Sequence, residues 1–153
     1  MIKTLKILFI LIFFVGNLKS TEYEITVLAT NIANFKGIGE WSFSALLESE
    51  NESIIFDTGF DENTVLHNAD LLGKDLSKVE KVILSHFHGD HTGGLIKLRK
   101  TFMKENPDAF SEVYVAEGFF EQRYDENGNL RGFIGGFDAV SYTHLRAHET
   151  INH

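Results

Sequence analysis

The stretch from Ser85 to Leu95, SHFHGDHTGGL, concentrates side chains that bind metal ions. Three histidines and an aspartate fall within six positions, namely His86, His88, Asp90 and His91. Neutral imidazole and carboxylate oxygen both suit Zn²⁺. Residues at i and i+2 of an extended segment share one side of the chain, so we expect His86 and His88 to reach one ion together. Gly89 permits a tight bend, after which Asp90 and His91 point to a second position.

Two metal ions about 3.5–4 Å apart can share a bridging hydroxide, which is a strong nucleophile at neutral pH. The pattern therefore predicts a two-metal hydrolytic centre. Gly93 and Gly94 are expected to begin the next helix, whose positive end would lie near the anionic ligands and any anionic substrate. The alternative is a chance cluster of surface histidines, which four ligand-type residues at this spacing disfavour.

The composition limits which partners the protein can bind and which residues can serve as metal ligands. The chain has 153 residues, with 14 Lys and Arg against 22 Asp and Glu, a formal charge of −8, and 43% of its residues are hydrophobic. This length predicts one domain at most. The acidic balance argues against nucleic acid as a partner, because phosphate neutralisation requires Lys and Arg. There is no cysteine, so thiolate zinc sites and disulfides are excluded.

The N-terminal residues 1–20 are typical of a secretory signal peptide. Lys3 and Lys6 precede a short apolar run that ends at Val15, and Ser20 offers a small residue for cleavage. The run is too short for a comfortable membrane-spanning helix, which needs about 20 residues. The protein is therefore expected to be exported, to the periplasm or outside the cell, without a stable membrane span after cleavage. An uncleaved anchor or a buried strand is the alternative.

The remaining sequence predicts strands first and then strands that alternate with helices. Strands are predicted over residues 23–30, 40–47, 53–56, 81–85 and 112–116, and helices over 62–72 and 92–104. Asn127-Gly128 is a hairpin-turn signal. The Asp125–Asn129 segment resembles the start of a calcium loop but lacks its glycine, so a plain turn is favoured. This order suits an α/β (α+β) fold with helices packed outside a sheet.

The SHFHGDH segment resembles the H-x-H-x-D-H signature of the metallo-β-lactamase superfamily. That resemblance implies an αββα sandwich with two divalent ions, Zn²⁺ before Fe or Mn, at one edge of its sheets. His86 and His88 would bind the first ion, and Asp90 and His91 the second, with Asp90 as the catalytic residue that orients the attacking water. Asp57, in IIFDTG, matches the superfamily's earlier aspartate, which supports the metal loop by hydrogen bonding without touching the metal.

A narrower resemblance is carried by the pieces FDTG, LHNA, LG-DLS and LSH-DHTGGL. They are similar to the proteins related to 7,8-dihydropterin-6-methyl-4-(β-D-ribofuranosyl)aminobenzene-5′-phosphate synthase, although shared ancestry does not transfer that activity. His67, within LHNA, is expected to be a structural histidine. Asp57-Thr58-Gly59 also matches the aspartic-protease triplet, but only one copy is present, so that alternative would require a homodimer.

The superfamily also requires a third histidine, a bridging aspartate and a last histidine after the signature. His144, His148 and His153 are not accepted for these roles, because Val140–Thr150, VSYTHLRAHET, resembles the translation of a transposase mosaic-end sequencing adapter. Residues 139–153 are thus predicted to be a non-native tail. Residues 21–138 would be the N-terminal portion only of a metallo-β-lactamase domain.

The predicted function is a metal-dependent hydrolase in which a metal-bound hydroxide attacks a small-molecule substrate. An ester, a lactone, a thioester and a phosphodiester remain open as substrates. One alternative is a non-catalytic metal-binding fragment, since this truncated chain is expected to be inactive compared with its full-length parent. A second alternative is an iron-dependent redox protein of the same fold, because His and Asp sites accept several metals.

Overall fold

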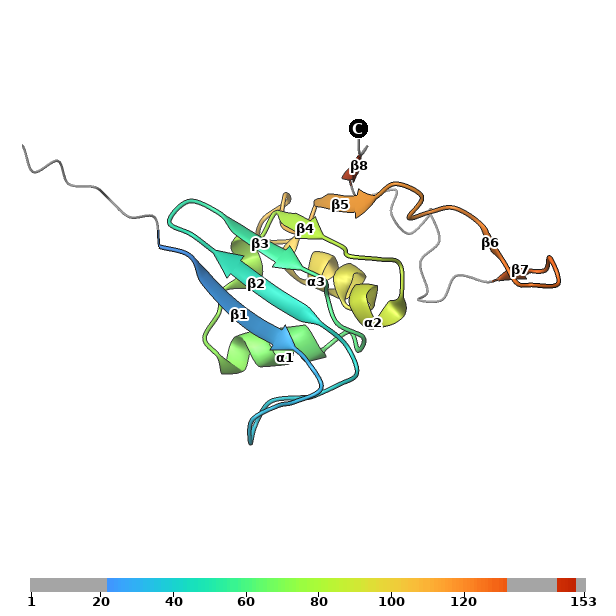
Figure 1. Ribbon diagram of the computed structural model, residues 1–153. Helices are drawn as coiled ribbons and strands as arrows, with labels where there is room; N and C mark the ends of the chain where they lie inside the picture. The colour runs from blue at the N-terminus through green and yellow to red at the C-terminus, as the bar shows by residue number, and fades with distance from the viewer. Residues whose placement is uncertain (1–21, 132–145, 151–153) are drawn as a thin grey trace, which may run out of the picture.

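The computed structural model describes residues 22–131 and, for the backbone alone, residues 146–150. Figure 1 shows one twisted sheet with helices packed against it. The sheet has six strands in the order β1-β2-β3-β4-β5-β8, and a separate two-stranded ribbon pairs β6 with β7. The strands are β1 Glu24–Ala29, β2 Ser44–Glu48, β3 Ser53–Phe56, β4 Lys81–Ile83, β5 Glu112–Ala116, β6 Arg123–Tyr124, β7 Leu130–Arg131 and β8 Arg146–Thr150.

The direction of the strands changes in the middle of the sheet. β1, β2 and β3 run antiparallel as a meander, whereas β3, β4 and β5 are mutually parallel. Ile55 of β3 pairs with Val82 of β4, which pairs with Val113 of β5. The parallel crossovers contain α1 Thr64–Leu71, the 3₁₀ turn η1 Leu76–Lys78, α2 Gly89–Thr92 and α3 Leu95–Phe102. This is the mixed α/β architecture that the order of predicted elements indicated.

The core lies between the sheet and its helices, on one face of the sheet. Its residues come from the strands, where Val113 and Val115 of β5 lie two positions apart as one face of a pleated sheet requires, and from the helices α1 and α3. They include Leu28, Leu46, Ile55, Val82 and Val113 from the strands and Val65, Ala69, Leu95 and Leu98 from the helices. On the other face, Ile25 and Val27 of β1 have exposed side chains, as does Tyr23 just before the strand.

Two predicted boundaries are wrong, and both errors lie beside the metal-ligand motif. The strand predicted from residue 40 begins only at Ser44, because residues 40–43 bond to other loops. The helix predicted over 92–104 is shorter, because α3 spans Leu95–Phe102 and the separate one-turn helix α2 ends at Thr92. Gly94 is the N-cap of α3, so the glycine pair lies at the start of that helix, as predicted, and separates it from α2. That the positive end of α3 lies near the ligands stays a prediction.

The β6–β7 ribbon closes through a turn at Asp125–Asn129, as the Asn-Gly signal predicted. Gly128 adopts φ 79°, a conformation that glycine reaches without strain. The Asp125 carboxylate accepts hydrogen bonds from the backbone of Asn127 and from Asn129. Hydrogen bonds from Asn129 lower the pKa of Asp125. The carboxylate is thus engaged in holding a plain turn.

The two ends of the chain are described only in part. The predicted signal peptide lies outside the described residues, and within residues 22–131 and 146–150 no helix has the length and apolar character to cross a membrane. β8 pairs with β5 in parallel. Any strand can pair with an open sheet edge through its backbone, so this pairing does not test the predicted adapter origin of the tail. His144 and His153 lie outside the described residues.

Helix α1 anchors the long loop between β1 and β2 through the LHNA motif. The Asn68 amide donates to the carbonyl oxygens of Leu28, at 2.7 Å, and Ile38, at 2.9 Å, and it accepts from the Ile38 N–H at 2.8 Å. The neighbouring His67 contacts the Lys36 carbonyl oxygen through Nε2 at 2.9 Å. Both side chains hold the loop, which agrees with the structural role predicted for His67.

We expect Asn68→Ala to lower the free energy of unfolding by about 1–3 kcal/mol, because a buried carbonyl oxygen and two loop groups lose their partner. Urea unfolding monitored by circular dichroism measures the change. Asn51→Ala, in the exposed β2–β3 turn, is the matched control and should change stability by less than about 0.5 kcal/mol. Equal effects of the two substitutions would contradict the anchoring role of Asn68.

Candidate metal centre

The parallel pairing of β3 and β4 brings two loops to one edge of the sheet. β3 ends at Phe56 and is followed by Asp57, whose N–H donates to the Ile83 carbonyl oxygen at the end of β4. The chain after β4 bends through Ser85–His88 and enters α2. Because parallel strands end at the same edge, the DTG loop (Asp57–Gly59) and the metal loop (Ser85–His91) lie side by side.

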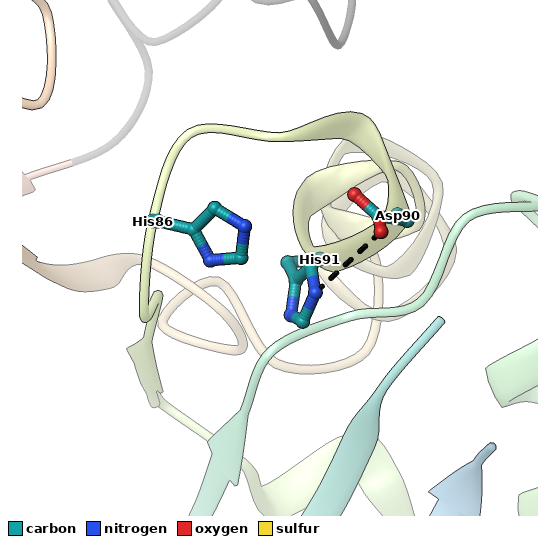
Figure 2. Close-up of side chains that lie close together, drawn as sticks. All are labelled: His86, Asp90 and His91. Atoms are coloured by element: carbon teal, nitrogen blue, oxygen red, sulfur yellow. Dashed lines mark ion pairs between the residues drawn. The ribbon is translucent and has the colours of Figure 1, made fainter. Parts of the chain in front are cut away.

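Three side chains of the metal loop converge. One ligand atom from each of His86, Asp90 and His91 lies within 4.8 Å of the other two, and Figure 2 shows these side chains facing a shared space. The His86 and His91 ring centroids are 4.2 Å apart, and His91 Nε2 lies 3.6 Å from Asp90 Oδ2. All three side chains are half-buried, so solvent and an ion can reach them.

His88 lies beside this trio without joining it. Its ring centroid is 4.7 Å from that of His86, in an edge-to-face arrangement. The residues Ser85–Phe87 form a bend, so the alternation of an extended strand does not hold between His86 and His88. The structure thus groups His86 with Asp90 and His91, and the prediction that His86 and His88 share one ion stays a prediction.

Asp57 connects the two loops beneath the trio. Its side chain is 1% exposed, and its backbone adopts φ 54°, a strained conformation for a residue with a side chain. Oδ1 accepts from the Ser85 N–H at 2.8 Å, and Oδ2 accepts from the Ser85 hydroxyl at 2.8 Å. Oδ2 also lies 2.7 Å from His91 Nδ1. The DTG loop therefore holds a ligand-bearing residue of the metal loop in place.

These contacts determine which ring nitrogens are free to bind a metal. A carboxylate only accepts, so the proton shared with Asp57 is carried by His91 Nδ1, and His91 Nε2 keeps its lone pair. The Ser85 hydroxyl gives its one proton to Asp57 and lies 2.9 Å from His86 Nδ1. His86 Nδ1 therefore donates to Ser85, and His86 Nε2 is also left as a ligand atom.

The electrostatic surroundings keep His86 in its ligand form. Burial lowers the pKa of His86, and the neighbouring His91 and His88 lower it further because a second positive charge would repel them. A neutral imidazole is the form that coordinates a metal. At neutral pH His86 is therefore ready to bind without first losing a proton.

Ser85 is a residue of the site that the sequence motif did not indicate. It precedes His86 directly, yet its partner Asp57 lies 28 positions earlier in the chain. A serine has no distinctive spacing signal, and only the parallel strand pairing shows that it relays the Asp57 contact to His86. The partners of Asp57 are a serine and a histidine, which favours the metal interpretation of the DTG triplet over the aspartic-protease alternative.

Backbone hydrogen bonds fasten the two loops together. The Thr58 N–H donates to the His91 carbonyl oxygen at 2.7 Å, and the Gly93 N–H donates to that of Gly59 at 2.9 Å. A Cβ atom on Gly93 would lie 2.0 Å from the Phe60 carbonyl oxygen, and one on Gly94 would lie 2.3 Å from the Thr58 carbonyl oxygen. The glycine pair is thus required for close approach of the loops.

The comparisons with known proteins agree with this fold. Residues 42–106 match the model of the metallo-beta-lactamase superfamily, and the chain belongs to that superfamily. A solved metal-dependent hydrolase of the beta-lactamase superfamily has a TM-score of 0.59 and 27% identity, over 86% of this chain and 43% of its own. The expected fold family is therefore confirmed.

Two curated relatives are similar over a large part of this chain. The 7,8-dihydropterin-6-methyl-4-(beta-D-ribofuranosyl)-aminobenzene-5'-phosphate synthase of Methanocaldococcus jannaschii is 35% identical over 114 residues, which cover 67% of this chain and 38% of the relative. The ribonuclease Z of Thermococcus onnurineus is 30% identical over 112 residues, which cover 63% and 35%. The chain thus spans less than half of either relative. The similarity to a ribonuclease also weakens the prediction, made from the acidic composition, that nucleic acid is not a partner.

We expect Gly94→Ala to lower the free energy of unfolding by about 1–3 kcal/mol, because the new methyl group would overlap the Thr58 carbonyl oxygen. The backbone of Gly94 is helical, with φ −79° and ψ −17°, so propensity alone would favour alanine. Urea unfolding decides between the two effects, with Lys100→Ala on the exposed side of α3 as a control. A stabilised Gly94→Ala protein would show that the loops do not approach closely.

We expect Asp57→Asn to weaken Zn²⁺ or Co²⁺ binding about 10- to 100-fold, because an amide cannot accept at both oxygens as the carboxylate does. Metal titration of the metal-free protein measures the dissociation constant. Asp70→Asn, the same change on the exposed side of α1, should leave binding unchanged. Equal affinities of the Asp57→Asn and Asp70→Asn proteins would show that Asp57 does not support metal binding.

Proposed function

We propose that the protein is a metal-dependent hydrolase whose centre includes His86, His88, Asp90 and His91, supported by Asp57. The observation that carries this proposal is the convergence of His86, Asp90 and His91 within 4.8 Å at the edge of the sheet. Membership of a superfamily with metal-dependent hydrolases supports it. A structural zinc site is disfavoured, because such a site is closed by four ligands, whereas these side chains remain partly exposed.

The residues present fit a divalent ion. Imidazole nitrogen and carboxylate oxygen form a donor set that suits Zn²⁺, with Fe and Mn as alternatives. Two ions are proposed, as the H-x-H-x-D-H spacing indicates. A bound ion supplies Lewis acidity and lowers the pKa of a coordinated water molecule. The chain's own contribution is to fix the ligands before binding, which reduces the ordering that the ion must impose.

The side chains around the centre also determine which histidine nitrogens carry protons. Asp57 holds a proton on His91 Nδ1 and, through Ser85, favours one on His86 Nδ1, so that both Nε2 atoms remain acceptors. Asp90 lies 3.6 Å from His91 Nε2 and carries a carboxylate that can accept a hydrogen bond from water. We therefore assign Asp90 the role of orienting the attacking water.

A small ester, lactone, thioester or phosphodiester is proposed as the substrate. The matched relatives favour the phosphodiester, because one is named a ribonuclease and another is named as the synthase of a phosphate compound. The net charge of −8 favours a small substrate over a long polyanion. Export through the N-terminal residues 1–20 is part of the same proposal and rests on their sequence pattern alone.

We expect the purified protein to retain bound metal after dialysis and His91→Ala to lose most of it, with affinity about tenfold weaker or worse. His67→Ala removes a histidine that lies on α1 outside the centre and should retain the metal. Elemental analysis and Co²⁺ titration measure the difference. Equal metal content in the His91→Ala and His67→Ala proteins would contradict the proposed centre.

Hydrolysis is tested on the same protein with bis(p-nitrophenyl) phosphate, p-nitrophenyl butyrate and an acyl homoserine lactone. Any turnover should disappear with a chelator and return with added Zn²⁺. Turnover that persists in the chelator would contradict the proposal and favour the aspartic-protease interpretation of Asp57. A visible absorption band together with bound iron would favour the redox alternative.

A further inference from the structure

We infer that Glu40 is a positioning residue of the metal centre, a role that rests on the proposed function of that centre. Glu40 lies in the loop between β1 and β2, far from the metal-ligand motif in sequence. Its carboxylate fixes the conformation of the loop after β3, and that loop in turn fastens the metal loop.

The Glu40 carboxylate accepts four hydrogen bonds, which is the number of its lone-pair positions. Oε1 accepts from the Phe60 N–H at 2.7 Å and from the Ser42 hydroxyl at 2.6 Å. Oε2 accepts from the Asp61 N–H at 3.0 Å and from the Thr64 hydroxyl at 2.9 Å. One half-buried side chain thus binds the middle of the segment between β3 and α1 and the first residue of α1.

The loop is shaped to receive this carboxylate. Gly59 adopts φ 75°, and a Cβ atom on it would lie 2.8 Å from Glu40 Oε1. The position therefore requires a glycine both for its backbone conformation and for the space that the carboxylate occupies. Glu40 and Gly59 are two parts of one contact, although they lie 19 positions apart in the sequence.

The same loop is the support of the metal loop. Gly59 accepts from the Gly93 N–H at 2.9 Å, and Thr58 donates to the His91 carbonyl oxygen at 2.7 Å. Phe60, whose N–H is held by Glu40, presents its carbonyl oxygen against Gly93. A shift of the loop would therefore move the backbone of His91, which carries one of the converging ligands.

A carboxylate is required at position 40 because all four partners are donors. In Glu40→Gln, an NH₂ group replaces one oxygen, and whichever way the amide is oriented it faces at least one backbone N–H. That backbone N–H loses its acceptor, and the hydroxyl on the same side must rotate to accept instead, while the side-chain size is kept. Glu50→Gln is the matched control, since Glu50 is exposed in the turn between β2 and β3.

The test uses the full 153-residue chain and two readouts. Amide hydrogen exchange followed by NMR should show that Glu40→Gln loses protection at Phe60, Asp61, Thr58 and Gly93, while Leu46 and Val82 in the core keep theirs. Co²⁺ titration followed by visible absorbance should show binding that is about 10- to 100-fold weaker, with an altered spectrum. Glu50→Gln should match the unsubstituted protein in both readouts.

Unchanged protection at Thr58 and Gly93 in Glu40→Gln would overturn the inference, and so would unchanged Co²⁺ affinity and spectrum. Loss of protection throughout the core would also overturn it, because Glu40 would then support the whole fold and not the loop. If the unsubstituted protein binds no Co²⁺, the proposed function fails. The inference then fails too, because there is no metal centre to position. The two failures are distinguishable: only in this case does the unsubstituted protein bind no Co²⁺.

Discussion

The buried carboxylate of Asp57 is the contact on which the arrangement of the site depends. It joins a loop that follows β3 to a loop that follows β4, and it bonds to Ser85 and His91. Burying a carboxylate is costly unless it is hydrogen-bonded, so these partners must be in place whenever the chain is folded. The centre is therefore largely organised before any ion arrives, which is how outer hydrogen bonds tune a metal site.

Around that contact, the two loops approach so closely that side chains are excluded between them. Gly93 and Gly94 have helical backbones, and neither needs to be glycine for its conformation. They are small because carbonyl oxygens of Thr58 and Phe60 occupy the space beside them. The Glu40 carboxylate contacts the same loop, at Gly59 and through the Phe60 N–H. The centre thus rests on backbone packing as much as on its ligands.

The sheet shows why this part of the chain forms an organised edge. The helices cover one face, where the apolar side chains of β1–β5 are buried, and the parallel strands β3 and β4 deliver both loops to one end. The opposite face of β1 leaves Tyr23 and Ile25 exposed. This chain aligns with less than half of the matched hydrolase and of the curated synthase. The activity of the whole protein is therefore a proposal.

The sequence by itself determined the elements and the type of chemistry. Period-two and period-3.6 patterns located most strands and helices, and the spacing of His86, His88, Asp90 and His91 indicated a metal centre. Only the tertiary structure decided that His86 groups with Asp90 and His91, that Ser85 relays the Asp57 contact, and that the glycine pair separates two helices. The reason is physical: hydrophobic periodicity is a local property, whereas the contacts of Asp57 with Ser85 and His91 join residues 28 and 34 positions apart through the parallel pairing of β3 and β4. The grouping of His86 depends on the bend after β4, which no periodic pattern describes.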